Sequence, residues 1–167
     1  MLNLSLKEVN SNILQVAPKP AEYSDIVELL AEITEVLSEN GVEFRFEILG
    51  DKWDMDVYMD LLVFLEQFPS FSKMISTDEY ERFELTFYEQ GPQRILTFTN
   101  NISSLEVSCL SLSEWKPRFE KETLDKEETI RVLQEFRNDL MRIMKKYCPN
   151  LAANPMFNKW CGDLKLT

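Results

Sequence analysis

Four aspartates lie within ten positions of the segment GDKWDMDVYMD: Asp51, Asp54, Asp56 and Asp60. Carboxylates at such spacing could hold a divalent cation, transfer a proton or bind a basic partner. The spacing does not match the D-x-D-x-D-G pattern of an EF-hand calcium loop, and a leucine-rich run follows it. Asp56 and Asp60 lie one helical turn apart and could share a magnesium ion. The sequence offers neither a second carboxylate cluster nor a phosphate-binding loop to complete that site.

The same aspartates also have a structural interpretation. Asp54 is placed to cap a helix that begins after it, and Asp56 then lies in the first turn, where the helix dipole stabilises negative charge. Capping does not require Asp51 or Asp60. A helix start and a surface for a basic partner therefore both stay open.

Trp53 lies among these charges, at the entrance of the predicted helix. A tryptophan surrounded by acidic residues is typical of a contact residue for an Arg- or Lys-rich partner. A hydrophobic staple, in which Trp53 folds back on Val57, is the alternative.

The net charge of −11 is concentrated in the first part of the chain. Residues 1–68 carry 14 acidic and 4 basic side chains, which gives −10, whereas residues 69–167 carry 15 and 14, which gives −1. Such a field repels nucleic acid and anionic membranes and speeds association with a basic protein. We expect a basic protein partner, with neither nucleic acid nor a membrane as partner; an acidic surface that only keeps the protein soluble is the alternative.

The chain contains no histidine, which excludes Ser-His-Asp and Cys-His catalysis and histidine-based zinc sites. We expect no enzymatic activity and no cofactor, although carboxylate pairs, lysine and tyrosine remain as acid–base groups.

Three widely spaced cysteines fit a reducing compartment. No signal peptide and no apolar run long enough to span a membrane is present, so the expected location is the cytoplasm.

A second acidic row is predicted on a helix that Asp25 begins, by a capping box with Glu28, and that Gly41 ends. Its exposed side carries four glutamates: Glu28, Glu32, Glu35 and Glu39. Like charges four residues apart destabilise a helix slightly, so this row is a further candidate surface for a basic partner.

The remaining periodicity predicts an α+β fold: one domain, residues 1–167, with an antiparallel sheet of about four strands packed against helices. Residues 1–22 fit both a strand and a helix. The predicted strands are 42–49, 82–89, 94–99 and 104–110. The predicted helices are 54–68 (ended by Pro69 and followed by a loop), 126–147 (capped by Asp125) and a short one opened by Asn154-Pro155 and closed by Gly162.

The segment KWDMDVYMDLLVFLEQF followed by FELTFYEQGPQRILTF resembles the small acidic immunity proteins of bacterial polymorphic-toxin and contact-dependent growth inhibition systems. The resemblance covers residues 42–118. It implies a cytoplasmic protein that binds a cognate toxin domain, often a nuclease with a basic groove, and blocks it. No functional residue is carried over by motif, so the candidate contact residues above rest on charge alone.

Two other functions stay open beside this one. The first is a different acidic binding protein, either a secretion chaperone or a phage-encoded inhibitor that mimics DNA. The second is an enzyme that uses a carboxylate pair or a metal ion.

Overall fold

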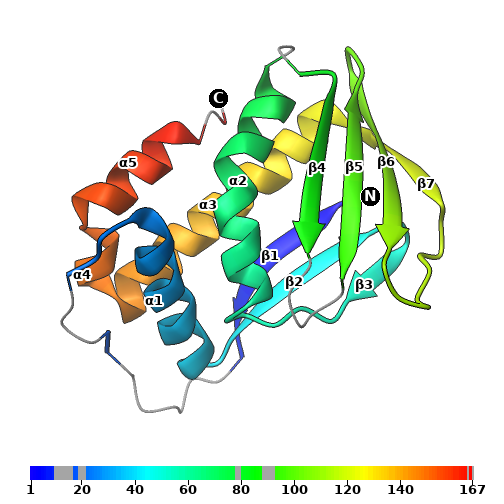
Figure 1. Cartoon of the computed structure of the whole chain (residues 1–167). Helices are drawn as coiled ribbons and strands as arrows, with labels where there is room; N and C mark the ends of the chain where they lie inside the picture. Colours follow the sequence, from blue (N-terminus) through cyan, green and yellow to red (C-terminus); the bar gives the residue numbers. More distant parts are fainter. Residues whose placement is uncertain (10–16, 19–21, 78–79, 88–92, 165, 167) are drawn as a thin grey trace.

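Two antiparallel sheets and five helices make up the part of the chain that the computed structural model describes, residues 1–9, 17–18, 22–77, 80–87, 93–164 and 166 (Figure 1). The α+β prediction with a four-stranded antiparallel sheet is confirmed, although the predicted strand 42–49 belongs to the other sheet. A second, three-stranded sheet was not predicted.

The three-stranded sheet has the order β1-β2-β3, with β1 Asn3–Glu8, β2 Val42–Ile48 and β3 Asp51–Trp53. Of the uncertain N-terminal segment, Asn3–Glu8 form a strand that buries Leu4 and Leu6, and residues 10–16 and 19–21 lie outside the described residues. Strands β2 and β3 are joined by Leu49 and Gly50, whose φ angles are 55° and 78°. Positive φ at both positions is what a two-residue hairpin turn of type I′ requires.

The four-stranded sheet has the order β4-β5-β6-β7, with β4 Arg82–Phe87, β5 Arg94–Asn100, β6 Ser104–Ser111 and β7 Lys121–Asp125. The first three of these strands were predicted. Strand β7 was missed because its sequence, KETLD, contains a single apolar side chain, Leu124. Residues 90–92 of the predicted hairpin turn lie outside the described residues.

The helices are α1 Ile26–Glu39, α2 Asp60–Ser76, α3 Lys126–Tyr147, α4 Pro149–Ala152 and α5 Pro155–Asp163. The predicted caps of α1 and α3 are confirmed: Asp25 and Asp125 each accept a hydrogen bond from the backbone N–H three residues later, at 3.0 and 2.8 Å. Gly41, directly after the C-cap of α1, has a φ of 68°.

Three predicted helix boundaries are wrong. Helix α2 begins at Asp60 rather than after Asp54, and it continues through Pro69 to Ser76, where a loop was predicted. The helix persists because Phe71, Met74 and Ile75 extend its buried face beyond the proline, and this burial outweighs the backbone hydrogen bond that a proline cannot donate. Helix α5 likewise contains Gly162 and ends one residue later.

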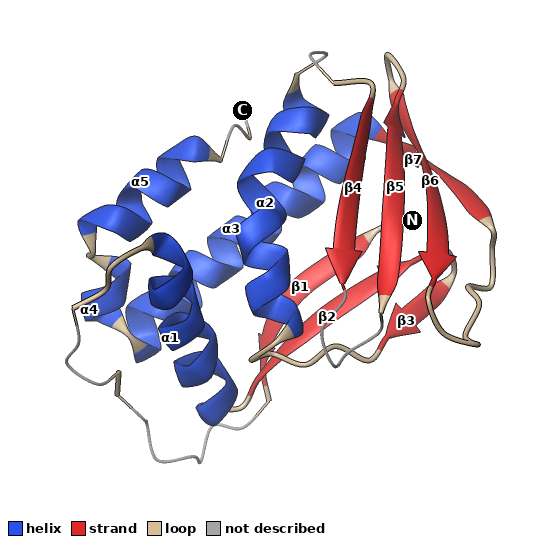
Figure 2. Ribbon diagram, in the orientation of Figure 1, coloured by secondary structure: helices blue, strands red, loops and turns tan. Residues whose placement is uncertain are grey.

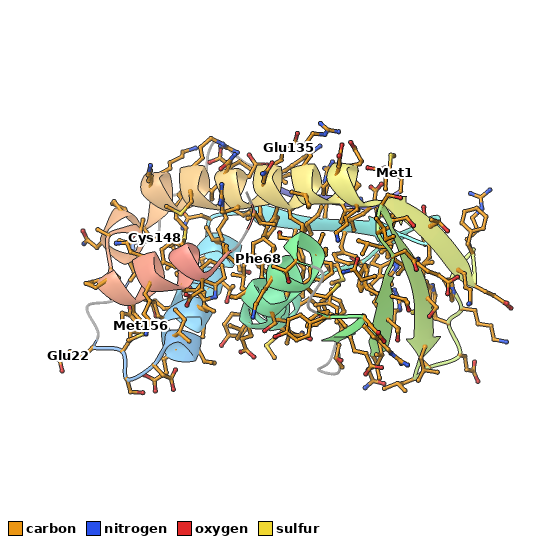
Figure 3. The ribbon with its side chains drawn as sticks, turned by 90° about the horizontal axis from the view of Figure 1, so that it is seen from above. Met1, Glu22, Phe68, Glu135, Cys148 and Met156 are labelled. Atoms are coloured by element: carbon orange, nitrogen blue, oxygen red, sulfur yellow. The ribbon has the colours of Figure 1, made fainter. Side chains whose placement is uncertain are left out.

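The helices gather beside the two sheets, with α2 against β4 (Figure 2). Viewed from above, α3 runs along one side of the molecule and packs on β1 (Figure 3). One continuous set of buried apolar side chains joins these elements. At its centre, Phe64 of α2 contacts Phe44 of β2 and Phe136 of α3, with ring centroids 5.6 and 5.3 Å apart.

Gln67 of α2 binds the backbone of β4 at its outer edge. Its Nε2 donates to the Thr86 carbonyl and its Oε1 accepts from the Thr86 N–H, both at 2.9 Å. One side-chain amide therefore takes the place of a neighbouring strand at this residue. At Thr86 this edge therefore has no free backbone group to offer another strand.

Gln67→Ala should lower the free energy of unfolding by about 1–3 kcal/mol, because the Thr86 amide and carbonyl lose their partners in a half-buried place. Denaturant unfolding measures this loss. Gln134→Ala on α3 is the control, with an expected change within about 0.5 kcal/mol. Equal effects of the two substitutions would show that the bonds to β4 contribute nothing.

Candidate functional site

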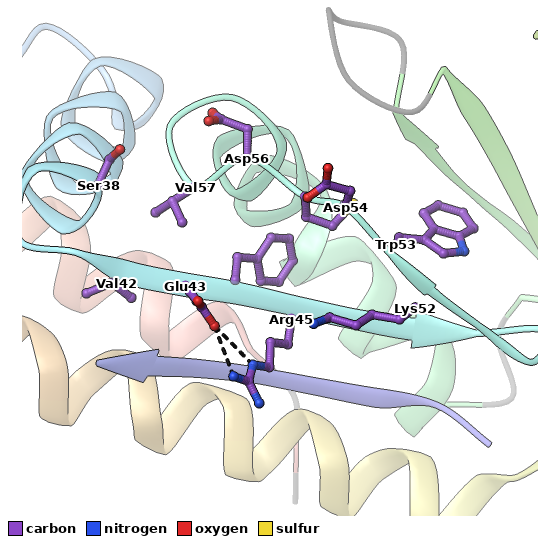
Figure 4. Close-up of a pocket in the computed structure, with 11 residues that line it drawn as sticks. Ser38, Val42, Glu43, Arg45, Lys52, Trp53, Asp54, Asp56 and Val57 are labelled. Atoms are coloured by element: carbon purple, nitrogen blue, oxygen red, sulfur yellow. Dashed lines mark hydrogen bonds and ion pairs between the residues drawn. The ribbon is translucent and has the colours of Figure 1, made fainter. Parts of the chain in front are cut away.

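A hollow of about 270 Å³ lies between the last turn of α1, strand β2 and the segment that leads from β3 to α2 (Figure 4). We call it the α1–β2 hollow. Charged residues of both signs line it: Glu43, Arg45, Lys52, Asp54 and Asp56. Glu43 and Arg45 neutralise one another on β2, with 3.0 Å between carboxylate and guanidinium. Asp54 and Asp56 lie above β2, across the hollow from that pair (Figure 4).

Residues 54–59, which we call the acidic turn, are held in shape by two aspartates whose carboxylates accept hydrogen bonds from backbone N–H groups. Asp56 Oδ1 accepts from the Met59 N–H at 2.7 Å, and Asp60 Oδ2 accepts from the Asp56 N–H at 2.8 Å. Asp54 therefore does not cap the helix, contrary to the prediction. Its carboxylate is exposed and has no hydrogen-bond or ion-pair partner among the described residues. Asp54 is thus the aspartate of the cluster that is fully available to a partner.

Asp60 serves the fold and cannot reach a partner, because its side chain is only 2% exposed. Burial raises its pKa, and the neighbouring carboxylates of Asp56 and Asp54 add to that shift. The backbone hydrogen bond from Asp56 and the positive charge of Arg94 oppose it. Folding therefore favours the neutral form of the Asp60 carboxyl.

Trp53 is buried, which corrects the prediction that it is a contact residue. Its side chain is 1% exposed and packs against Phe46, Phe87 and Trp115, with ring centroids 5.2, 5.9 and 5.7 Å apart. The ring thereby fixes β3, and with it the acidic turn that follows, to the four-stranded sheet and the β6–β7 loop. The sequence could not reveal this role because the partners lie more than 30 residues away along the chain, except Phe46.

Arg94 of β5 lies between two tryptophans. Its guanidinium carbon is 4.4 Å from the ring centroid of Trp53 and 3.3 Å from that of Trp115. Two of its nitrogens, Nε and Nη1, are buried without a hydrogen-bond partner, and burial lowers its pKa. The faces of the two indole rings stabilise this cation in place of hydrogen bonds.

Asp51 also has a structural role: its Oδ2 accepts from the backbone N–H of Arg118 at 2.6 Å. This bond ties β3 to the loop between β6 and β7. Asp60 is buried, whereas Asp51 is half-buried and binds this loop.

The four glutamates of α1 do not form one uniformly exposed row. Glu28 and Glu39 are exposed, whereas Glu32 and Glu35 are half-buried. Glu28 accepts from the Ser24 N–H at 2.8 Å and completes the predicted capping box. Glu39 directly follows Ser38, which lines the α1–β2 hollow, so this glutamate lies at the same end of the molecule as the acidic turn.

The structure therefore brings Asp54 and Asp56 of the predicted set together at the α1–β2 hollow, with Glu39 next to the lining residue Ser38, and separates the rest. It adds Glu43, Arg45 and Lys52, which the sequence analysis did not single out as site residues. Nothing in the sequence of the predicted strand 42–49 indicated that the face of Glu43 and Arg45 borders the acidic turn. Within the described residues, no three Cys, Asp or Glu side chains are grouped to hold a metal ion. What the arrangement can do is present unpaired carboxylates to a cationic group.

Comparison with known protein families, with curated proteins and with solved structures gave no match. None of the helices in the described part of the chain is both long and apolar enough to cross a membrane.

The raised pKa of Asp60 predicts a pH dependence of stability. The stability that comes from the protonated Asp60 carboxyl is fully present below the ordinary pKa of aspartate. It is lost as the pH rises through the raised pKa. Asp60→Asn keeps an oxygen that accepts from the Asp56 N–H but does not ionise. This variant should therefore be at least as stable as the parent at pH 7, and its advantage should shrink as the pH falls.

Thermal melts of both proteins across the acidic range measure this difference. Asp60→Ala, which removes the acceptor, should instead lose about 1–3 kcal/mol. Asp163→Asn, at an exposed position on α5 that does not contribute to the Asp60 shift, serves as the control and should show the same pH dependence of stability as the parent. If the melting temperatures of Asp60→Asn and the parent changed in parallel with pH, the raised pKa of the buried Asp60 carboxyl would be contradicted.

Proposed function

We propose that this protein is a toxin-neutralising immunity protein, which binds the basic surface of a cognate toxin domain in the cytoplasm and blocks it without catalysis. The exposed carboxylates at one end of the molecule form its contact surface: Asp54 and Asp56 of the acidic turn and Glu39 at the end of α1. The toxin domain that best fits such a surface is nuclease-like, because a groove that binds phosphates also attracts carboxylates.

The observation that carries this proposal is the state of the acidic turn. Asp54 has no internal partner in the described structure, while Asp60 and Asp56 use backbone N–H groups to hold the turn in one conformation. Trp53 is buried directly before it. The backbone that carries Asp54 and Asp56 is therefore ordered before the partner arrives, which reduces the entropy lost on binding.

Long-range attraction adds to this surface. The contact surface is surrounded by elements from the part of the chain whose net charge is −10. These elements are β1, α1, β2 and β3. Such a field steers a basic partner toward the contact surface, and salt screens it. Fast association that slows with ionic strength is thus an intrinsic part of the proposed function.

The first experiment is affinity capture of the tagged protein from its native cells with elution by increasing salt. A basic protein should elute at high salt or in denaturant, and its toxin domain, expressed alone, should stop growth. Co-expression of the present chain should restore growth. Growth arrest that co-expression does not relieve would exclude neutralisation, and recovery of many unrelated unfolded proteins would indicate a chaperone.

The contact surface is tested with a triple variant: Glu39→Gln, Asp54→Asn and Asp56→Asn. Removal of three exposed carboxylates should lower the association rate constant with the captured partner by about tenfold at low salt, and by less as salt is added. Stopped-flow binding measures the rate.

The matched control removes three exposed carboxylates elsewhere: Glu81→Gln, Glu127→Gln and Asp163→Asn. It changes the net charge equally, so it should slow association by a much smaller factor. If both triple variants slow association equally, total charge governs binding and the acidic turn is not the contact surface.

A further inference from the structure

A second hollow lies where β6 runs beyond its neighbour β7. The pairing of these strands ends at Ser108 and Lys121, so Cys109–Ser111 pair with β5 on one side only. The chain returns to β7 through a loop that stands away from β6. The space between them measures about 500 Å³, and we call it the β6 hollow. Its volume is typical of sites that bind small molecules.

The loop that forms the outer wall of this hollow is held in place by contacts with the β2–β3 hairpin. The Phe119 N–H donates to the Leu49 carbonyl at 3.1 Å, and the Arg118 N–H donates to the Asp51 carboxylate at 2.6 Å. A side chain at Gly50 would collide with Phe119, since a Cβ there would come within 2.5 Å of its ring. The hollow is therefore formed without a ligand.

Two cations without ionic partners line the β6 hollow. Lys116 and Arg118 are both exposed, and neither side chain makes an ion pair or hydrogen bond within the described structure. Glu120 is the acidic residue of the lining. Behind the Trp115 wall lies the guanidinium of Arg94, which adds a third positive charge. The lining of the hollow is thus locally positive, although the protein as a whole has a net charge of −11.

The remaining lining supplies apolar contact and hydroxyl groups. Leu110, Trp115 and Pro117 provide apolar surface, and Ser111 and Ser113 hold one another with hydroxyl oxygens 3.2 Å apart. Cys109 is a neutral thiol, because burial raises its pKa to about 11. The chemistry is that of a site for an anionic group joined to an apolar body.

We infer that the β6 hollow binds a small organic anion whose carboxylate or phosphate lies between Lys116 and Arg118 and whose apolar part contacts Trp115 and Leu110. This site is separate from the acidic turn and does not depend on the proposed toxin partner. Two charged donors fix the anion, and the apolar wall removes the rest of the ligand from water.

Titration of the ¹⁵N-labelled protein with phenyl phosphate and with benzoate at low salt tests the inference. The three tryptophans of the chain give three indole N–H signals, and Trp115→Phe assigns the signal of interest. This signal should shift and saturate below about 10 mM of the probe, as expected for a weak fragment-sized ligand. The probe that binds more tightly identifies the preferred anionic group. Benzyl alcohol, with the same ring and no charge, should leave the signal in place.

The double variant Lys116→Ala/Arg118→Ala should weaken binding of the probes roughly tenfold or more. Its control, Lys145→Ala/Lys159→Ala, removes two exposed cations on α3 and α5 and should bind as the parent does. Both variants should melt with the parent, since all four side chains are exposed. Absence of a saturable shift, an equal shift with benzyl alcohol, or unchanged binding by the first variant would overturn the inference.

Discussion

The contact of the Arg94 guanidinium with the rings of Trp53 and Trp115 is the interaction on which the rest of the structure depends. The three residues come from β5, from β3 and from the β6–β7 loop, so their contact joins the two sheets and the longest described loop. A guanidinium with two nitrogens that are buried and unpartnered is costly unless something replaces water around them. The two indole faces do so, and this requirement holds all three segments in register.

Each of the two hollows is lined by one of these two tryptophans. Trp53 lines the α1–β2 hollow, and Trp115 lines the β6 hollow. Because the two rings also contact one another, with centroids 5.7 Å apart, a shift of one wall would displace the other. The two surfaces nevertheless differ in charge: unpaired carboxylates border the first, and unpaired cations border the second. An acidic protein can thus carry a basic site, provided that the local charges outweigh the distant field, which salt screens.

The aspartates of the 51–60 segment show how one cluster of identical residues is divided between fold and function. Asp51 and Asp60 accept backbone hydrogen bonds that hold the fold, and Asp60 is in addition buried. Asp56 holds the acidic turn and is still exposed, and Asp54 is exposed without a described partner. The charge of such a cluster therefore overstates the surface that it can offer. The sequence alone could not make this division, because each role depends on which backbone N–H lies within reach.

The sequence by itself determined the α+β class, the caps of α1 and α3, and most strands, because these features depend on side chains a few residues apart. It also determined the concentration of negative charge before residue 69. Only the tertiary structure decided that Trp53 is buried, that α2 continues past Pro69, and that two hollows of different charge exist. These features depend on contacts between distant segments, whose burial outweighs local preferences for capping, helix ends and exposure.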